Sequence, residues 1–160
     1  MSTRVPLPYT PKVLELFKEP KNLGKIEDAD AFAQAGSPAC GDVISIYLRI
    51  REGIIEDAKF ESYGCAANIA AASVLTEVVK GKSLEEAWNI DWQQIADELG
   101  GLPPVKKHCS ILAVGALRRA IRRYFGDNLP EWLPKDLTSV ERQALEEEEM
   151  IERIYGKLRR

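Results

Sequence analysis

The chain has 160 residues, of which 45% are hydrophobic and 29% are charged, and its formal net charge is −3. This length suits one ordinary domain with an extension, and the acidic balance argues against a surface that binds nucleic acid. The longest mainly apolar run, residues 63–76, is too short to span a bilayer, and the N-terminal residues lack the apolar stretch of a signal peptide, so we expect a cytoplasmic protein that binds no membrane.

The N-terminal third predicts a short helix, a loop and a β-hairpin. Thr10 suits an N-cap and Pro11 suits the first helical position, so a helix should begin there. Residues 27–41 have no clear period, and we expect them to form a loop. Apolar and polar residues alternate over 43–50 and again over 54–63, which is typical of two antiparallel strands joined by a short turn.

Four helices are predicted between the hairpin and residue 126. The alanine-rich residues 66–80 form the first, and capping patterns at Ser83 and Asp91 begin two short ones. An extended proline segment then leads into a long helix that ends near Phe125. Its inward face should carry Leu112, Ala116, Leu117, Ala120, Ile121 and Tyr124. A solvated face should carry Arg118, Arg119, Arg122 and Arg123.

These elements predict an α+β fold in which helices pack on one side of a small antiparallel sheet. We expect residues 1–126 to form the main domain. Residues 127–160 add a proline-containing linker and a C-terminal helix that starts at Ser139. The apolar stripe of this helix is broken, so it should pack on the core or on a second subunit.

The three cysteines are too sparse, and odd in number, for a disulfide framework. Cys40 lies in a Gly/Pro loop, while Cys65 and Cys109 lie at predicted helix starts. The positive end of a helix lowers the pKa of a thiol and favours the thiolate, which binds metals and attacks sulfur. Because Lys106 and Lys107 act in the same direction, we expect Cys109 to be reactive, whereas Cys65 suits a reactive role or a packing role equally.

The single histidine, His108, stands beside Cys109, and Asp42 follows Cys40 by two positions. Three thiolates and an imidazole suit an iron–sulfur cluster or zinc, whereas a carboxylate is a harder ligand than a permanent cluster usually has. The spacing by itself is not specific, because no Cys-x-x-Cys pair is present. A nucleophile pair of Cys109 and His108 is not expected, since adjacent helix residues point about 100° apart.

Four segments surround these residues or lie between them: GSPACGD at 36–42, YGC at 63–65, TEVVKGK at 76–82 and LPPVKKHCS at 102–110. Together they resemble the U-type iron–sulfur scaffold family, which includes IscU and the N-terminal domain of NifU. The resemblance implies a scaffold rather than an enzyme, on which [2Fe–2S] clusters are assembled from iron and sulfur and then passed to acceptor apo-proteins. It also implies the cluster ligands Cys40, Asp42, Cys65, His108 and Cys109.

The resemblance further implies several partners. A PLP-dependent cysteine desulfurase supplies sulfur as persulfide, and Cys109 is the candidate acceptor. An Hsp70-type chaperone would recognise the segment formed by Leu102, Pro103, Pro104, Val105 and Lys106. A ferredoxin and a second copy of the chain are further candidate partners.

Two other functions compete with the scaffold. The zinc-dependent sulfurtransferase branch of the same fold accepts persulfide at a zinc-bound cysteine, but it usually carries an insertion before its last cysteine and lacks the LPPVK segment. The short spacing from Cys65 to Cys109 therefore favours the scaffold. A zinc-stabilised interaction module would explain the ligands, but it would not explain two thiols at helix starts beside lysines.

Overall fold

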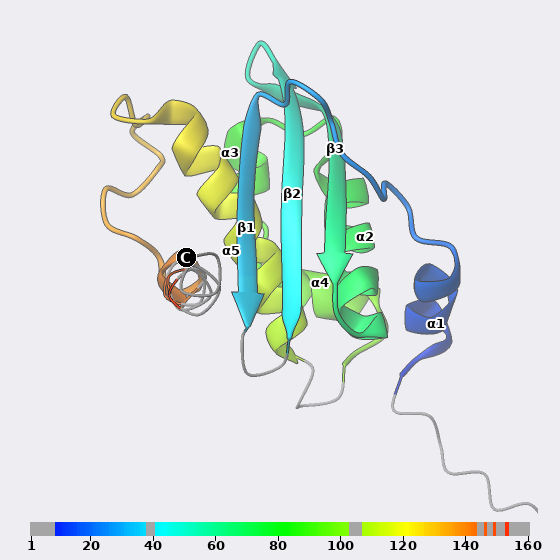
Figure 1. The fold of residues 1–160 in the computed structure, drawn as a ribbon. Coiled ribbons are helices and arrows are strands. Elements are labelled where there is room, and N and C mark those ends of the chain that lie inside the picture. Colours follow the sequence, from blue (N-terminus) through cyan, green and yellow to red (C-terminus); the bar gives the residue numbers. More distant parts are fainter. Residues whose placement is uncertain are drawn as a thin grey trace, which may run out of the picture.

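The computed structural model describes residues 9–37, 41–102 and 107–143, together with residues 146, 149 and 153. In this part of the chain one antiparallel sheet has the strand order β1-β2-β3. The strands are β1 (Ala31–Ser37), β2 (Asp42–Arg51) and β3 (Ile54–Tyr63), and the helices are α1 (Pro11–Lys18), α2 (Ala66–Val79), α3 (Leu84–Trp88), α4 (Trp92–Glu98) and α5 (Lys107–Phe125). Helices α2 to α5 lie behind the sheet, which confirms the predicted α+β fold (Figure 1).

The first strand differs from the prediction. Residues 31–37 were expected to lie in a loop, but they form β1 and pair with β2 from Ala31↔Leu48 to Ser37↔Asp42. The inward positions of this strand are buried alanines, Ala31, Ala33 and Ala35. Alanine is a weak strand former, and its small side chain gives little alternating hydrophobic signal, so the prediction was wrong here.

The helix boundaries follow the predicted capping residues. Oγ1 of Thr10 accepts a hydrogen bond from the backbone N–H of Val13 at 3.3 Å, and the capping box at Ser83 is present.

No helix in the described part of the chain is long and apolar enough to cross a membrane. Tyr124, which was predicted to face inward, is 42% exposed, so that prediction was wrong. Its ring packs edge-on against Phe125, which contacts Trp132.

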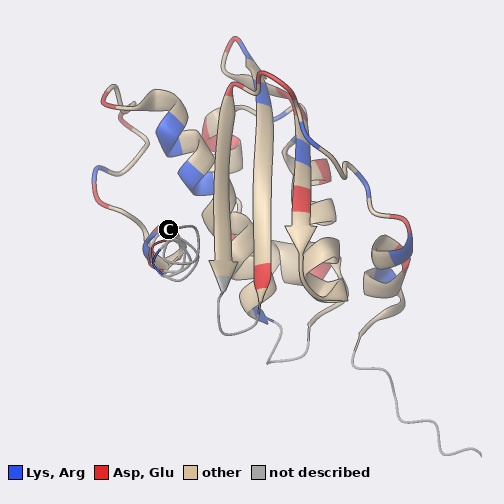
Figure 2. Ribbon diagram, in the orientation of Figure 1, with Lys and Arg blue, Asp and Glu red and all other residues tan. Residues whose placement is uncertain are grey.

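The predicted solvated face of α5 is confirmed only in part, because Arg123 is exposed, Arg118 and Arg122 are half-buried and Arg119 is buried. Figure 2 shows basic residues along the second half of this helix. Arg119 is only 8% exposed, and its Nη1 donates to the backbone oxygen of Gln34 on β1 at 2.7 Å. Burial lowers the pKa of Arg119 to about 10. Arg123 donates to the backbone oxygen of Phe32 at 3.3 Å. Both bonds use carbonyl groups of an edge strand. Unpaired carbonyl groups at a sheet edge can form hydrogen bonds with a strand of another chain.

The beginning of the C-terminal extension packs on the core. Leu133 is 3% exposed within the core, and Trp132 contacts the rings of Trp88 and Phe125. Residues 139–143 are helical, as predicted for the start of the C-terminal helix. The segment after residue 126 thus shares the core of the domain. The division of the chain at residue 126 stays a prediction.

An ion pair joins this extension to α5. The side chain of Glu141 is fully buried and accepts hydrogen bonds from Nη2 of Arg122 at 3.1 Å and from the backbone N–H of Thr138 at 2.7 Å. Burial raises the pKa of Glu141, but the hydrogen bonds from Arg122 and Thr138 outweigh burial and hold the pKa below its ordinary value. The negative charge therefore stabilises the docked extension.

We predict that Glu141→Gln lowers the free energy of unfolding at neutral pH by about 1–3 kcal/mol, because the guanidinium of Arg122 loses its charged partner. The pKa of Glu141 is lower in the folded state than in the unfolded state, so its contribution is present at neutral pH and is lost as the pH falls through the folded pKa. Urea denaturation should therefore show a difference between variant and wild type that shrinks in acid. Glu98→Gln, at an exposed position of α4, is the matched control; a difference that does not change with pH would contradict the ion-pair explanation.

Candidate metal centre

Asp42, Cys65, His108 and Cys109 meet at one end of the sheet although they come from three parts of the chain. Asp42 is the first residue of β2, Cys65 is the N-cap of α2, and His108 and Cys109 lie in the first turn of α5. The antiparallel register pairs the beginning of β2 with the end of β3. Cys65 comes two residues after β3, so this pairing brings it to Asp42.

The carboxylate of Asp42 connects the three parts. Its side chain is almost completely buried. Oδ1 accepts a hydrogen bond from the backbone N–H of Cys65 at 3.0 Å. Oδ2 lies 3.1 Å from Nε2 of His108 and 3.9 Å from Sγ of Cys109. A single buried side chain thus positions a backbone group, an imidazole and a thiol.

Two thiols lie side by side in this site. The sulfur atoms of Cys65 and Cys109 are 3.8 Å apart. Cys109 is completely buried, whereas Cys65 is partly exposed. Nε2 of His108 is also 3.8 Å from Sγ of Cys109, so the expectation that these neighbouring side chains point apart was wrong. The side chains of His108 and Cys109 both contact the carboxylate of Asp42.

These donor atoms are close enough to bind a metal ion. Within the described residues, ligand atoms of Asp42, His108 and Cys109 all lie within 4.8 Å of one another. Cys65 lies outside that group of three, against Cys109. Two thiolates on one tetrahedral ion, at metal–sulfur distances of about 2.3 Å, are themselves about 3.8 Å apart, which is the separation of the Cys65 and Cys109 sulfurs. Soft thiolates with an imidazole suit iron or zinc.

The structure tests only part of the predicted site. It brings together Asp42, Cys65, His108 and Cys109, whereas Cys40 lies outside the described residues. The predicted chaperone segment is described only at Leu102, which packs half-buried against the core. Its other members, Pro103, Pro104, Val105 and Lys106, also lie outside the described residues.

Two residues of the site were missed in the sequence. A Cβ atom on Gly64 would lie 2.2 Å from Oδ1 of Asp42, so a side chain at this position would collide with the carboxylate. Asn68 is completely buried on α2, and its Nδ2 donates to Oγ of Ser62 at 2.7 Å and to the backbone oxygen of Val43 at 3.3 Å. The sequence feature that could have identified Asn68 is a single amide within a run of alanines. A buried amide needs hydrogen-bond partners, so an amide at such a position indicates a structural role.

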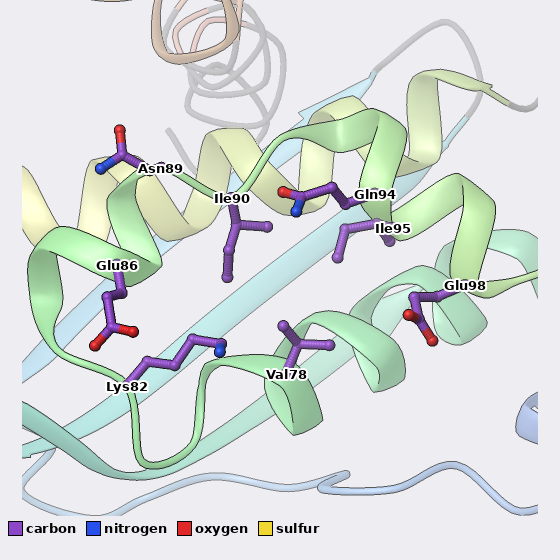
Figure 3. Close-up of a pocket in the computed structure, with 8 residues that line it drawn as sticks. All are labelled: Val78, Lys82, Glu86, Asn89, Ile90, Gln94, Ile95 and Glu98. Atoms are coloured by element: carbon purple, nitrogen blue, oxygen red, sulfur yellow. The ribbon is translucent and has the colours of Figure 1, made fainter.

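A pocket of about 430 Å³ lies elsewhere, between α2, α3 and α4 (Figure 3). Apolar Val78 and Ile95 line it together with charged Lys82 and Glu98. Val78 is near the C-terminal end of α2, about 20 Å along the helix from Cys65 at 1.5 Å per residue. The pocket is therefore separate from the group of thiols.

Similarity to known proteins assigns the family. Residues 8–130 match the family described as NifU-like N terminal domain. The iron–sulfur cluster assembly scaffold protein IscU 1 of Archaeoglobus fulgidus is 52% identical over 120 residues, which cover 75% of this chain and 78% of that protein. IscU of Haemophilus influenzae, which carries the same scaffold name, is 50% identical over 120 residues, which cover 72% of this chain and 94% of that protein.

Solved structures agree with this assignment. A protein of Fervidobacterium islandicum AW-1, described as an iron–sulfur cluster assembly scaffold for the SUF system, superposes with a TM-score of 0.60 and 26% identity over 71% of this chain and 96% of that chain. A NifU-like N-terminal domain from Brucella abortus has the same fold, with a TM-score of 0.60 and 24% identity. The fold and the site thus define a U-type scaffold domain. This chain belongs to the NifU-like N-terminal domain family, as its motifs indicated.

We predict that Gly64→Ala weakens metal binding at the thiols, because the new methyl group collides with the Asp42 carboxylate and with Nδ2 of Asn68 and so shifts the backbone that carries Cys65. Titration with Co²⁺, followed through its thiolate absorption bands, should show an affinity reduced by about tenfold or more, since displacement of the Cys65 thiolate from its place costs at least about 1.4 kcal/mol. Gly81→Ala is the control, because Gly81 also has a positive φ but a Cβ there meets nothing within 4 Å. Equal affinity in both variants would show that the carboxylate adapts.

Proposed function

We propose that this protein is a scaffold on which iron–sulfur clusters are assembled and from which they are transferred to apo-proteins. The observation that carries the proposal is the convergence of Asp42, Cys65, His108 and Cys109 at one end of the sheet. Membership of a family whose relatives are named as cluster assembly scaffolds supports it. The cluster is the cargo of such a protein, and assembly on it needs no catalytic residue.

The donor atoms suit a small cluster with two irons. Cys65 and Cys109 would supply thiolates, and Cys40, two positions before Asp42 in the chain, would supply a third. Thiolates are the usual ligands of [2Fe–2S] clusters, and imidazole replaces them in some sites. His108 or Asp42 would complete the set, because both reach the position beside the Cys109 sulfur.

Sulfur delivery and transfer involve other proteins in this proposal. A cysteine desulfurase supplies persulfide sulfur, acceptor apo-proteins receive the cluster, and a ferredoxin, an Hsp70-type chaperone at residues 102–106 and a second copy of the chain are further partners. Cys109 would carry the persulfide, since it lies in the first turn of α5 beside His108. Because Cys109 is completely buried, loading it requires the surrounding residues to move apart.

A zinc-dependent sulfurtransferase is the second candidate. The group formed by Asp42, His108 and Cys109 is small enough for a single ion, and zinc binds mixed sets of thiolate, imidazole and carboxylate. In that case Cys109 would accept sulfur while bound to zinc. The two candidates differ in whether iron replaces the zinc during sulfur delivery.

Anaerobic reconstitution tests the scaffold. Protein incubated with ferrous iron, cysteine and a cysteine desulfurase should become coloured and contain iron and acid-labile sulfide in equal amounts. Cys109→Ser should lose most of this cluster, because it removes the thiol that contacts the other three groups. Stoichiometric zinc that never exchanges for iron under these conditions would overturn the scaffold and favour the sulfurtransferase.

Asp42→Ala tests how the cluster is released. A carboxylate is a harder and weaker ligand for a sulfide-bridged iron than a thiolate is, so Asp42 would hold its position loosely. We predict that the cluster of Asp42→Ala persists longer than that of wild type and moves more slowly to an acceptor apo-protein. Absorption spectra would follow cluster lifetime and transfer.

Asp42→Asn is the matched variant, because an amide oxygen still accepts the hydrogen bond from the Cys65 N–H. If Asp42 is a weak ligand, both variants should prolong the lifetime of the cluster. If Asp42 only positions Cys65 through this hydrogen bond, Asp42→Ala should lose its cluster faster than wild type, and Asp42→Asn should restore the lifetime of the cluster. That second outcome would contradict the weak-ligand proposal.

A further inference from the structure

The thiols of Cys65 and Cys109 are in contact but have different surroundings. Their sulfur atoms are 3.8 Å apart. Cys109 is completely buried against His108 and Asp42, whereas Cys65 is partly exposed at the N-terminus of α2, where the helix dipole favours a thiolate. A shared metal would require such proximity, and a thiol–disulfide reaction would use it as well.

We propose that Cys65 is the resolving thiol for a persulfide on Cys109, so that this pair of cysteines reduces sulfane sulfur to sulfide inside the assembly site. The inference rests on the proposed function, because it takes Cys109 as the persulfide carrier. It adds a source of the two electrons that convert sulfane sulfur into the sulfide of a cluster.

The reaction balances without an outside oxidant. The Cys65 thiolate attacks the inner sulfur of the Cys109 persulfide, which is the Sγ atom, and a bond forms between the two Sγ atoms. The bond between Sγ of Cys109 and the outer sulfur breaks, and the outer sulfur leaves with the electron pair as hydrosulfide. The two cysteines are oxidised to a disulfide, and the sulfane sulfur is reduced. A dithiol reductant then returns the disulfide to two thiols before the next cycle.

The geometry favours attack on the inner sulfur. The side chain of Cys109 holds this atom 3.8 Å from the Cys65 sulfur, so the two must approach by a little under about 2 Å to reach the bond length of a disulfide, about 2.05 Å. Hydrosulfide is a weaker base than an ordinary cysteine thiolate and therefore the better leaving group. The sulfide would be released beside Asp42 and His108, which are candidate ligands for iron.

The experiment uses reduced, metal-free, full-length protein under anaerobic conditions. Glutathione persulfide serves as the sulfur donor, and excess donor is removed rapidly by desalting. Mass spectrometry of peptides then locates the persulfide and any disulfide over time, and a bimane assay measures the sulfide released. Cys65→Ser is the test variant, because serine keeps a good N-cap for α2 and should preserve the fold.

In the wild type, the persulfide on Cys109 should decay while sulfide and a disulfide between Cys65 and Cys109 appear in equal amounts. In Cys65→Ser, the persulfide should persist on Cys109, with release of sulfide slowed by about tenfold or more. Equal rates in the two proteins, or a disulfide that joins Cys109 to Cys40 instead, would overturn the inference.

Two further outcomes separate this inference from the functions that it rests on. If Cys65→Ser never carries a persulfide on Cys109, Cys109 is not the acceptor, and the inference is overturned as well. In the other outcome, the wild type assembles a cluster from iron and inorganic sulfide but keeps its persulfide as long as Cys65→Ser does. That result would overturn the resolving role of Cys65 and would leave the scaffold function unaffected.

Discussion

A buried carboxylate is costly unless its oxygens find partners, because transfer of the charge out of water costs several kcal/mol. Asp42 meets this requirement with the backbone N–H of Cys65 on one oxygen and with His108 on the other. These two contacts join the beginning of β2 to the beginnings of α2 and α5. The positions of both described thiols depend on this one side chain, and the absence of a Cβ at Gly64 lets the carboxylate approach.

The rest of the domain supports this arrangement with small residues and paired charges. Alanines on the inner face of β1 and along α2 let the helices pack close to the sheet. Arg119 binds the edge of β1 from α5, and the ion pair of Arg122 with Glu141 binds the C-terminal extension to the same helix. Since α5 also carries His108 and Cys109 in its first turn, these contacts hold the helix that supplies half of the described donor groups.

In the proposed scaffold, the donor set would suit a cargo better than a permanent cofactor. Thiolates bind iron strongly, whereas a carboxylate binds it weakly in the presence of sulfide. A buried thiol in contact with a partly exposed one also suits sulfur chemistry, because a persulfide on the first is within reach of the second. Under the proposed function, the same few atoms would serve sulfur delivery, cluster assembly and release.

Local patterns in the sequence determined much of this protein. The alternating residues of the hairpin, the capping residues at Thr10 and Ser83 and the extent of α5 follow from interactions between near neighbours in the chain, and the motifs around Cys65 and Cys109 identified the family. Only the tertiary structure decided that residues 31–37 form a strand, that Arg119 is buried on its edge and that Asp42 links Cys65 to His108. The contacts of Asp42 and Arg119 join residues 23 to 85 positions apart, and no local propensity encodes such contacts. The pairing of residues 31–37 with β2 spans only 5 to 17 positions, but the alanines of this strand carry little strand propensity, so pairing within the folded sheet decided its structure.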